Sequence, residues 1–280
     1  MKKLIALILA LVMSLTLFAA CGAEKETTPT TTEATTEGTE PVDTTEGTEA
    51  PAEIKTVKEG KLIMATNAYF PPYEFYEGDK IVGIDAEIAA AIAEKLGLEL
   101  EISDMQFDSI ITAVKEGSAD MGLAGMTVNE DRLKEIDFSI SYASGVQSII
   151  VKEGSAIKTV DDLYAEGASY KVGVQLGTTG DIYATDDFGE DLVTQYNNGN
   201  EAVVALLGGD IDCVIIDNEP AKAFVAANEG LVILEASYAD EDYAACFAQE
   251  NDALREAVDA AILELTEDGT IDAIVAKYIK

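Results

Sequence analysis

Histidine is absent from this sequence of 280 residues, and arginine occurs only twice, as Arg132 and Arg255. The lack of histidine, and of any nucleophile paired with a base, argues against hydrolysis and acyl transfer. Lysine and arginine together number 18 against 53 acidic residues, so the formal net charge is −35. Such a charge opposes binding to nucleic acid or to an anionic membrane surface. We predict no catalytic residue, no cofactor, no metal site and no nucleic-acid partner.

Cysteine is also scarce, because only Cys213 and Cys246 occur beyond Cys21. Both lie in apolar, strand-like runs, where a cysteine usually packs as a small buried residue. Two free thiols are therefore favoured over a disulfide, although the sequence alone leaves the pairing open.

Residues 1–20 have the form of a secretion signal, with Lys2 and Lys3 followed by an apolar run that is too short to be a convincing membrane span. Ala19 and Ala20 precede Cys21, a pattern that resembles a bacterial lipobox, in which the cysteine becomes the lipidated first residue. Secretion with an unmodified cysteine is the alternative. We expect a lipid anchor at Cys21 and a location on the extracytoplasmic face of the cell membrane.

Residues 21–54 form a segment rich in threonine and glutamate. Residues 22–54 contain eleven threonines, nine acidic residues and three prolines, and the unit TTEGTE occurs at 35–40 and again at 44–49. A segment with so few large apolar side chains cannot offset its ordering entropy. We predict a disordered tether of roughly 30 Å average length by random-coil scaling.

About 225 residues remain, enough for two compact lobes. Apolar periodicity predicts strands at 61–66, 98–102 and 119–124, with helices that begin at Asp85 and Asp108 as N-caps. The alternation of strands and helices then repeats. We predict further strands at 145–151, 170–176, 192–196, 211–216, 231–235 and 243–247, and helices after 177–180, at 201–207, at 220–227 and from 251 onward.

This order predicts an α/β fold of two lobes, each with a mostly parallel sheet flanked by helices. The chain crosses between the lobes near 142–145 and again near 241–245. Residues 55–145 and 241–280 would form the first lobe, and residues 146–240 the second. In open α/β sheets ligands bind beyond the carboxyl ends of the strands, where residues 65–70, 105–108, 124–132, 177–180 and 216–218 converge.

Arg132 follows a turn that contains Gly125, Met126 and Thr127. Its planar guanidinium is suited to grip a carboxylate with two parallel hydrogen bonds. The Gly-Thr-Thr-Gly helix start at 177–180 offers free N–H groups and a favourable dipole for the same anion. The alternative is a surface arginine paired with a neighbouring acid, Glu130 or Asp131.

Asp217 ends an apolar strand, where a carboxylate without a partner would be costly. An ammonium group would satisfy it, and a carboxylate beside an ammonium describes the head group of a free α-amino acid. Phe70 and Phe107 could enclose the apolar part of the ligand's side chain between their rings, and Asn67 could contact a polar group at the end of that side chain. Purely structural roles are the alternatives: core packing for the two phenylalanines, and helix capping for Asp217 and Thr178.

Several motifs in this order resemble the family-3 extracellular solute-binding proteins, which are the polar amino-acid receptors of ABC importers. The resemblance spans roughly residues 60–278 and rests on residues 65–75 (ATNAYFPPYEF), 82–85 (VGID), 125–127 with Arg132, 136–139 (IDFS), 173–180 (GVQLGTTG) and 216–220 (IDNEP). It implies a type II periplasmic-binding-protein fold that closes on one amino acid, a membrane permease as partner, and a monomer.

The resemblance also implies roles for single residues. Arg132 and the amides near Thr179 and Gly180 would hold the ligand's carboxylate, while Asp217, the Gly125 carbonyl and the Thr127 hydroxyl would hold its ammonium. The ligand-binding set that we predict is Asn67, Phe70, Phe107, Gly125, Met126, Thr127, Arg132, Gln175, Thr178, Thr179, Gly180 and Asp217.

The ligand's side chain is constrained less tightly. Asn67 and Gln175 suit a neutral polar group, which we rank first. A cationic side chain, ranked second, would need a second carboxylate, for which Glu74 or Asp108 is available. A dicarboxylic ligand ranks last because the cleft stretches contain no cation besides Arg132. An enzyme of this fold, such as a dehydratase, is the alternative from another class. A membrane sensor would need a second span and a cytoplasmic module, which we do not find.

Overall fold

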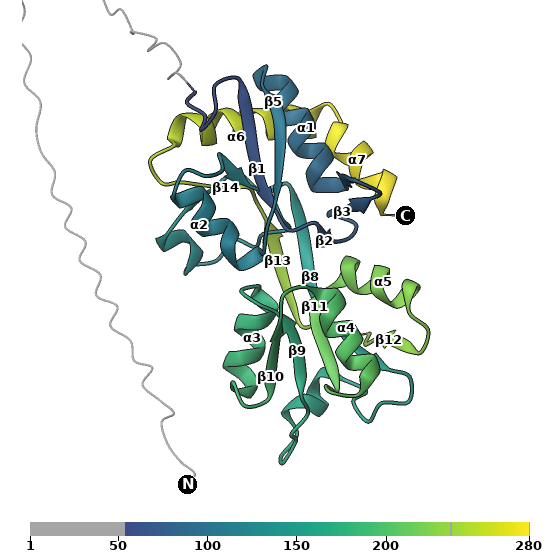
Figure 1. Ribbon diagram of the computed structural model, residues 1–280. Helices are drawn as coiled ribbons and strands as arrows, with labels where there is room; N and C mark the ends of the chain where they lie inside the picture. Colours follow the sequence, from purple (N-terminus) through teal and green to yellow (C-terminus); the bar gives the residue numbers. More distant parts are fainter. Residues whose placement is uncertain (1–53, 236, 280) are drawn as a thin grey trace, which may run out of the picture. The chain divides into compact units, whose positions relative to one another are not determined.

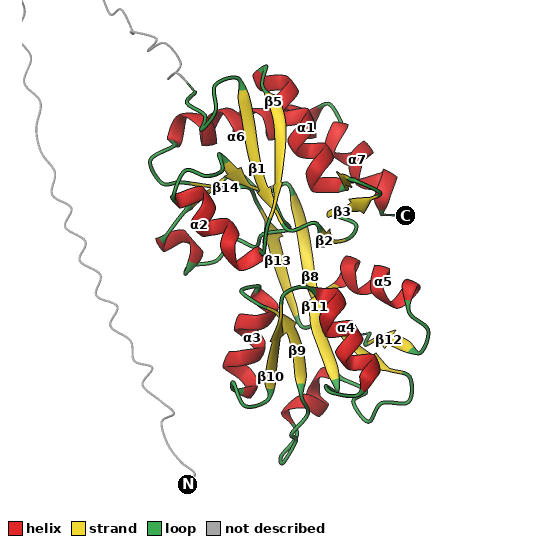
Figure 2. Cartoon of the chain, viewed as in Figure 1, coloured by secondary structure: helices red, strands yellow, loops and turns green. Residues whose placement is uncertain are grey.

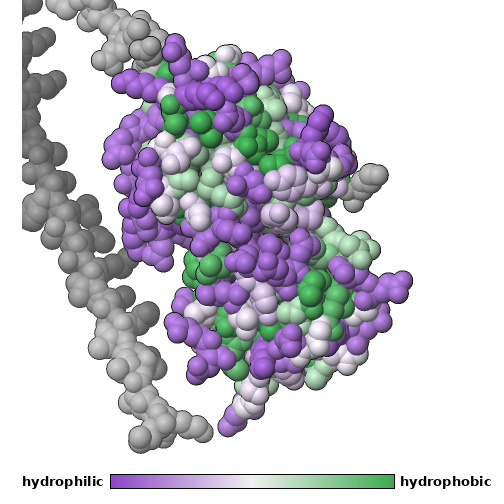
Figure 3. All heavy atoms as spheres, in the orientation of Figure 1, coloured by the Kyte–Doolittle hydropathy of each residue, from purple (hydrophilic) through white to green (hydrophobic). Residues whose placement is uncertain are grey.

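The computed structural model describes residues 54–235 and 237–279. The predicted signal, the lipidation site at Cys21 and all of the tether except Ile54 lie outside the described residues. Within the described ranges, no helix is long and apolar enough to cross a membrane. The face in Figure 3 is largely hydrophilic, in keeping with the formal net charge of −35.

The first sheet has the strand order β5-β1-β6-β14-β7 (Figure 1). Strand β1 (Lys61–Thr66) pairs in parallel with β5 (Glu99–Asp104) and β6 (Met121–Gly122), whereas β14 (Cys246–Phe247) runs antiparallel to β6 and to β7 (Asp137–Phe138). The helices of this lobe are α1 (Ile84–Leu96), α2 (Ile110–Lys115), α6 (Asp252–Glu267) and α7 (Thr270–Tyr278). A three-stranded antiparallel sheet beside them contains β2 (Tyr69–Phe70), β3 (Glu74–Glu77) and β4 (Lys80–Val82).

The second sheet has the order β10-β9-β11-β8-β12 (Figure 2). Strands β9 (Val172–Gln175), β10 (Val193–Tyr196) and β11 (Cys213–Asp217) are parallel, while β8 (Ala143–Lys152) and β12 (Leu231–Ile233) complete the sheet with antiparallel pairing. Its helices are α3 (Thr179–Phe188), α4 (Gly199–Gly208) and α5 (Asn218–Ala227).

Two antiparallel strands cross between the lobes. Strand β13 (Ala239–Tyr243) pairs with β8, from Ala143 opposite Tyr243 to Gln147 opposite Ala239. Figure 1 shows this pair running from the first sheet into the second. The predicted α/β architecture with two crossings is therefore confirmed.

Apolar faces at helical spacing explain the helices. In α1, Ile88 and Ile92 are 0% exposed and belong to the apolar core that also contains Leu62 and Met64 of β1. Helices α6 and α7 contact α1, so one layer of three helices covers this part of the lobe. Burial of several such side chains, at about 1.5–3 kcal/mol each, is what fixes the helices on the sheet.

Two predicted helix caps are wrong. Helix α1 begins at Ile84 after Gly83, and Asp85 lies inside its first turn with no exposure, where it accepts hydrogen bonds from the Gly125 N–H and the Tyr142 hydroxyl. Asp108 lies within a 3₁₀ turn, Phe107–Ser109, and α2 begins only at Ile110. An aspartate before an apolar run satisfies the capping pattern, but for Asp85 tertiary hydrogen bonds override it.

The two predicted thiols are free and buried, as expected. Cys213 lies on β11 of the second sheet and Cys246 on β14 of the first. Burial raises the pKa of each thiol to about 12, so neither is a reactive thiolate at neutral pH.

Candidate functional site

A cavity lies where strand ends of the two lobes meet. Ten of the twelve predicted ligand-binding residues line it, together with Glu74 and Ala124. The ten are Asn67, Phe70, Phe107, Gly125, Thr127, Arg132, Gln175, Thr178, Thr179 and Asp217. The first lobe supplies the residues up to Arg132 and the second lobe those from Gln175 onward, so the site is shared between them.

Arg132 is buried in this cavity, at 7% exposure, so the alternative of a surface arginine is wrong. Its Nη1 donates to the Thr127 carbonyl at 2.7 Å, and its Nη2 donates across the cleft to the Gly177 carbonyl at 3.1 Å. The guanidinium also lies over the Phe107 ring, 5.4 Å from the centroid. Since a guanidinium has five N–H donors, it can hold these carbonyls and still donate to an anion.

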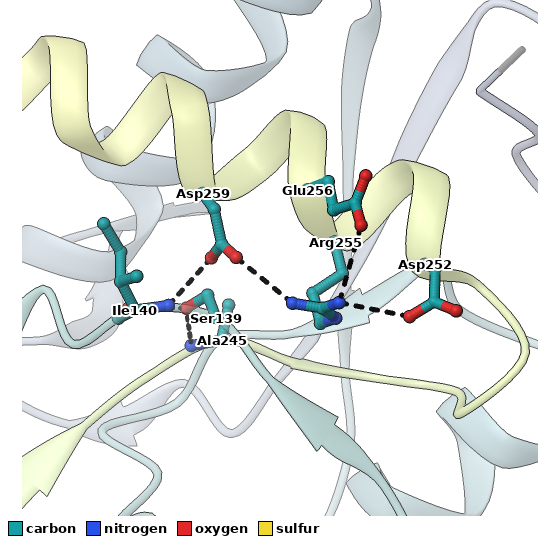
Figure 4. A network of polar contacts seen from close by, with 7 residues as sticks. All are labelled: Ser139, Ile140, Ala245, Asp252, Arg255, Glu256 and Asp259. Carbon is teal, nitrogen blue, oxygen red and sulfur yellow. Dashed lines mark hydrogen bonds and ion pairs between the residues drawn. The ribbon is translucent and has the colours of Figure 1, made fainter. Parts of the chain in front are cut away.

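The other arginine makes the opposite kind of contact. Arg255 on α6 forms partly exposed ion pairs with Asp252 at 3.1 Å and Asp259 at 3.3 Å (Figure 4). Asp259 in turn accepts from the Ile140 N–H at 2.8 Å. Arg255 therefore stays on the outer layer of the first lobe and serves as a natural control for Arg132.

The start of α3 faces Arg132 from the second lobe. Thr178 is the N-cap, and its hydroxyl accepts from the Asp181 N–H at 3.3 Å and donates to the Gln175 carbonyl at 2.8 Å. Capping and cavity lining are thus combined in Thr178. The first N–H groups of a helix have no partner within the helix, and here they lie beside the cavity. The Thr179 hydroxyl lies 3.4 Å from that of Thr127 across the cleft.

Asp217 ends β11 and lines the cavity with 6% exposure. It is the N-cap of α5 by position, but its side chain makes no capping bond and accepts instead from Gln147 Nε2 at 2.8 Å. Its other oxygen, Oδ1, has no partner among the described residues. Burial and the nearby Glu241 raise the pKa of Asp217 well above its usual range. A cation placed beside Oδ1 would stabilise the carboxylate.

Glu74 also lines the cavity, although the sequence indicated it only as a possible second carboxylate. It is fully buried, and within the described part of the chain neither of its oxygens meets a donor. It faces a second carboxyl, that of Asp85, and burial together with this neighbour raises the pKa of Glu74 well above its usual range. The pair can form a hydrogen bond when it shares one proton, and it then still carries one negative charge.

The Glu74–Asp85 pair predicts a pH dependence of stability. Burial raises the pKa of Asp85 from 3.8 to about 6, despite the opposing hydrogen bonds from Gly125 and Tyr142. Between these values the folded chain holds a proton that the unfolded chain has released, so the free energy of unfolding falls as pH rises from about 4 to about 6. Asp85→Asn should remove this contribution, so that the variant gains up to about 3 kcal/mol relative to wild type between pH 4 and pH 7.

Urea denaturation of both ligand-free proteins at several pH values measures this gain. Asp79→Asn, on the exposed turn between β3 and β4, is the control and should follow the wild-type curve. Parallel pH profiles for wild type and Asp85→Asn would show that the buried pair does not titrate in this range.

Two aromatic rings enclose the apolar part of the cavity. Phe70 and Phe107 are 6% and 8% exposed, and both also contribute to the apolar core, so packing and cavity lining coexist in them. Gly125, at φ 53, lies so close to Phe70 that an added Cβ would be 2.9 Å from the ring. Only glycine allows this approach at a positive φ, which brings the Phe70 ring against the turn that leads to Arg132.

Asn67 and Gln175 bridge the cleft directly. Gln175 Nε2 donates to Asn67 Oδ1 at 3.0 Å, and Asn67 Nδ2 donates to the Met105 carbonyl at 2.7 Å. The two predicted polar contacts for a ligand side chain are therefore occupied by one another, which leaves them less available to a neutral polar group.

Met126 and Gly180 do not line the cavity. Met126 has no exposure and belongs to the apolar core, while its carbonyl accepts from the Ala244 N–H at 3.1 Å. Gly180 lies in the first turn of α3, where an added Cβ would be 2.9 Å from Gln147 Oε1. Both residues support neighbours of the cavity; a direct contact of either with a ligand stays a prediction.

Two α/β lobes that share one buried site define the class of type II periplasmic solute-binding proteins. The family model of the bacterial extracellular solute-binding proteins, family 3, matches residues 62–280. The chain belongs to this family, and its location is extracytoplasmic.

Relatives agree with this assignment. The arginine-binding extracellular protein ArtP of Bacillus subtilis (strain 168) is 33% identical over 228 residues, which cover 78% of this chain and 86% of ArtP. An ancestral arginine-binding protein bound to arginine matches with a TM-score of 0.73 and 38% identity, over 79% of this chain and 99% of that one. The crystal structure of a mutant of ArgBP from T. maritima matches with a TM-score of 0.73 and 36% identity, over 78% and 95%.

Proposed function

We propose that the protein binds a free amino acid with a cationic side chain, arginine foremost, as the substrate-binding component of an ABC importer. The observation that carries this proposal is the additional buried carboxyl of Glu74 in the cavity lining. Binding occurs without chemical turnover, through closure of the two lobes on the ligand.

The charges of the cavity support a cationic side chain. Arg132 can pair with the carboxylate of an amino acid and Asp217 with its ammonium, so these two residues account for the zwitterionic head group. The negative charge shared by Glu74 and Asp85 is then uncompensated in a buried place. A guanidinium or ammonium at the end of the ligand's side chain would compensate it, because buried charges are stable only when paired.

This proposal ranks the two leading ligand classes differently from the sequence, which favoured a neutral polar side chain through Asn67 and Gln175. Gln175 donates to Asn67 at 3.0 Å, and Asn67 donates to the Met105 carbonyl, whereas Glu74 has no donor among the described residues. The names of the relatives include arginine as ligand, for ArtP and for the ancestral protein. Glutamine is the second candidate, since the ancestral protein was also solved bound to glutamine.

Glu74→Gln tests the assignment of the side-chain cation. The change keeps the size of the side chain and removes its charge, so the affinity for arginine should fall at least tenfold while that for glutamine changes less than threefold. Titration calorimetry with both ligands gives the two ratios. Glu77→Gln, on the exposed end of the same strand β3, is the matched control and should leave both affinities unchanged.

Equal losses for the two ligands in Glu74→Gln would mean that Glu74 does not face the ligand's side chain. A wild-type protein that prefers glutamine to arginine would restore the neutral polar assignment. Recovery of the ligand unchanged after prolonged incubation is the expected result on turnover, and conversion of the ligand would favour the enzyme alternative. The lipid anchor at Cys21, the permease partner and the monomeric state stay predictions.

A further inference from the structure

Behind Asp217 lies a buried cluster that has more hydrogen-bond acceptors than donors. Gln147 is 1% exposed and lies directly opposite Asp217 in the antiparallel pairing of β8 with β11. Its Nε2 donates both to Asp217 Oδ2 at 2.8 Å and to Glu241 Oε2 at 2.9 Å. One amide group thus joins two carboxylates, each of which takes one of its two N–H bonds.

Three acceptors of this cluster are left over. Asp217 Oδ1, Gln147 Oε1 and Glu241 Oε1 are buried, and none has a partner among the described residues. Buried polar groups in proteins are almost always paired, so a surplus of unpaired acceptors around two carboxylates marks a place for a donor-rich cation. Of the three residues only Asp217 lines this cavity, so a ligand bound in it meets the cluster through Asp217, whereas Glu241 lines a separate pocket beside Tyr183 and Asp242.

The cluster is tied to both strands that cross between the lobes. Gln147 belongs to β8, and Glu241 belongs to β13, where it is 7% exposed while Asp240 and Asp242 on either side are exposed. Gly180 allows the first turn of α3 to pack against Gln147, since an added Cβ would be 2.9 Å from Oε1. Gln147 is therefore held from three sides and can fix the orientation of the Asp217 carboxylate.

We propose that Gln147 is a positioning residue for Asp217 and that Glu241 is a second, remote carboxylate of the ammonium site. Gln147 holds Asp217 Oδ2, so that Oδ1 stays directed to the ligand's α-ammonium. Glu241 places a second carboxylate behind Asp217, which strengthens the dependence of binding on the α-ammonium. The proposal rests on the proposed function, because it assigns the cavity to a free amino acid.

Selectivity for the α-ammonium is the property to measure. The probe ligands are arginine and 5-guanidinopentanoate, which lacks only the α-ammonium. Wild type should bind arginine at least a hundredfold more tightly, because the analogue leaves two buried carboxylates without a cation. In Gln147→Met the affinity for arginine should fall at least tenfold and that for the analogue less than threefold. In Glu241→Gln the ratio of the affinity for arginine to the affinity for the analogue should fall at least threefold, since the remote charge is lost.

The control is Asp240→Asn, which removes one negative charge from the exposed face of the same strand and should leave the ratio unchanged. A loss of arginine affinity that the analogue shares equally would overturn the proposal, because a merely structural role of Gln147 affects both ligands alike. Unchanged ratios in both variants would overturn it as well. If Gln147→Met does not fold, Glu241→Gln decides, since its amide can donate to the unpaired Gln147 Oε1.

Different results would overturn the proposed function and this inference. If wild type binds glutamine and not arginine, the cationic assignment is wrong, and the same ratio is then measured with glutamine and glutaramate, its analogue without the α-ammonium. If the ratio of the glutamine affinity to the glutaramate affinity falls in Gln147→Met and Glu241→Gln, the positioning role holds with glutamine as the ligand. A ratio that stays constant overturns it.

Discussion

Arg132→Lys is expected to weaken arginine binding at least about a hundredfold, or about 2.7 kcal/mol. The guanidinium holds the Thr127 carbonyl and, across the cleft, the Gly177 carbonyl, and it has donors left for two parallel bonds to a carboxylate. A lysine ammonium is a point charge and cannot make the two-pronged contact. It would also lose one or both carbonyls, so the lobes would close less firmly on the ligand.

Arg255→Lys is the matched control for this prediction. Arg255 forms ion pairs on the outer surface of α6, and lysine can preserve much of that arrangement, so the affinity should stay within a factor of two. Titration calorimetry of both variants measures the difference, and ligand-free melting temperatures show whether each is folded. An Arg132→Lys protein that is folded and binds with wild-type affinity would place the ligand's carboxylate elsewhere.

Asp217→Asn is the second change for which we expect a large effect. The variant should bind arginine at least about a hundredfold more weakly, because a buried charge pair with the α-ammonium becomes a neutral contact. Its ligand-free melting temperature should not fall. An asparagine side chain can still accept from Gln147, and the substitution removes a buried carboxylate that Glu241 already destabilises.

The combination of weaker binding and undiminished stability identifies a binding role, since a structural aspartate would lose both. Asp240→Asn provides the same charge change on an exposed position and should alter neither quantity. A stable Asp217→Asn protein with wild-type affinity for arginine would contradict the assignment of Asp217 to the ammonium. A variant that fails to fold would show that Asp217 acts mainly in the structure.

Much of the fold could be predicted from the sequence because apolar periodicity and turn residues agree with it. The strand at 61–66 has the predicted bounds, and the Gly-Thr-Thr-Gly turn does start a helix with Thr178 as its N-cap. The errors arise where tertiary contacts override local patterns. Asp85 matches a capping pattern, yet it lies inside α1 because Gly125 and Tyr142 donate to it.

Strand lengths show the same limit. The apolar run at 119–124 contains only the two-residue strand β6, and the run at 243–247 is divided between β13 and β14, which belong to different sheets. Hydrophobicity indicates that these residues are buried, but it does not indicate which strand pairs with them.

The site shows which signals a sequence carries. Arg132 and Asp217 were predictable because a scarce cation and a charge at the end of an apolar strand are unusual in this chain. Glu74 stood out less, since it is one of 53 acidic residues and only the fold shows that it is buried without a donor. The contact between Asn67 and Gln175 was not predictable, because residues 108 positions apart meet only when the lobes come together.

The central claim is that the cavity holds one free amino acid with a cationic side chain. Titration calorimetry of the protein, freed of bound ligand by unfolding and refolding, against the twenty amino acids tests this claim most directly. The predicted result is one site of micromolar affinity or tighter for arginine, with glutamine at least tenfold weaker and aspartate and glutamate undetectable. Binding of no free amino acid in the micromolar range would contradict the account at its centre.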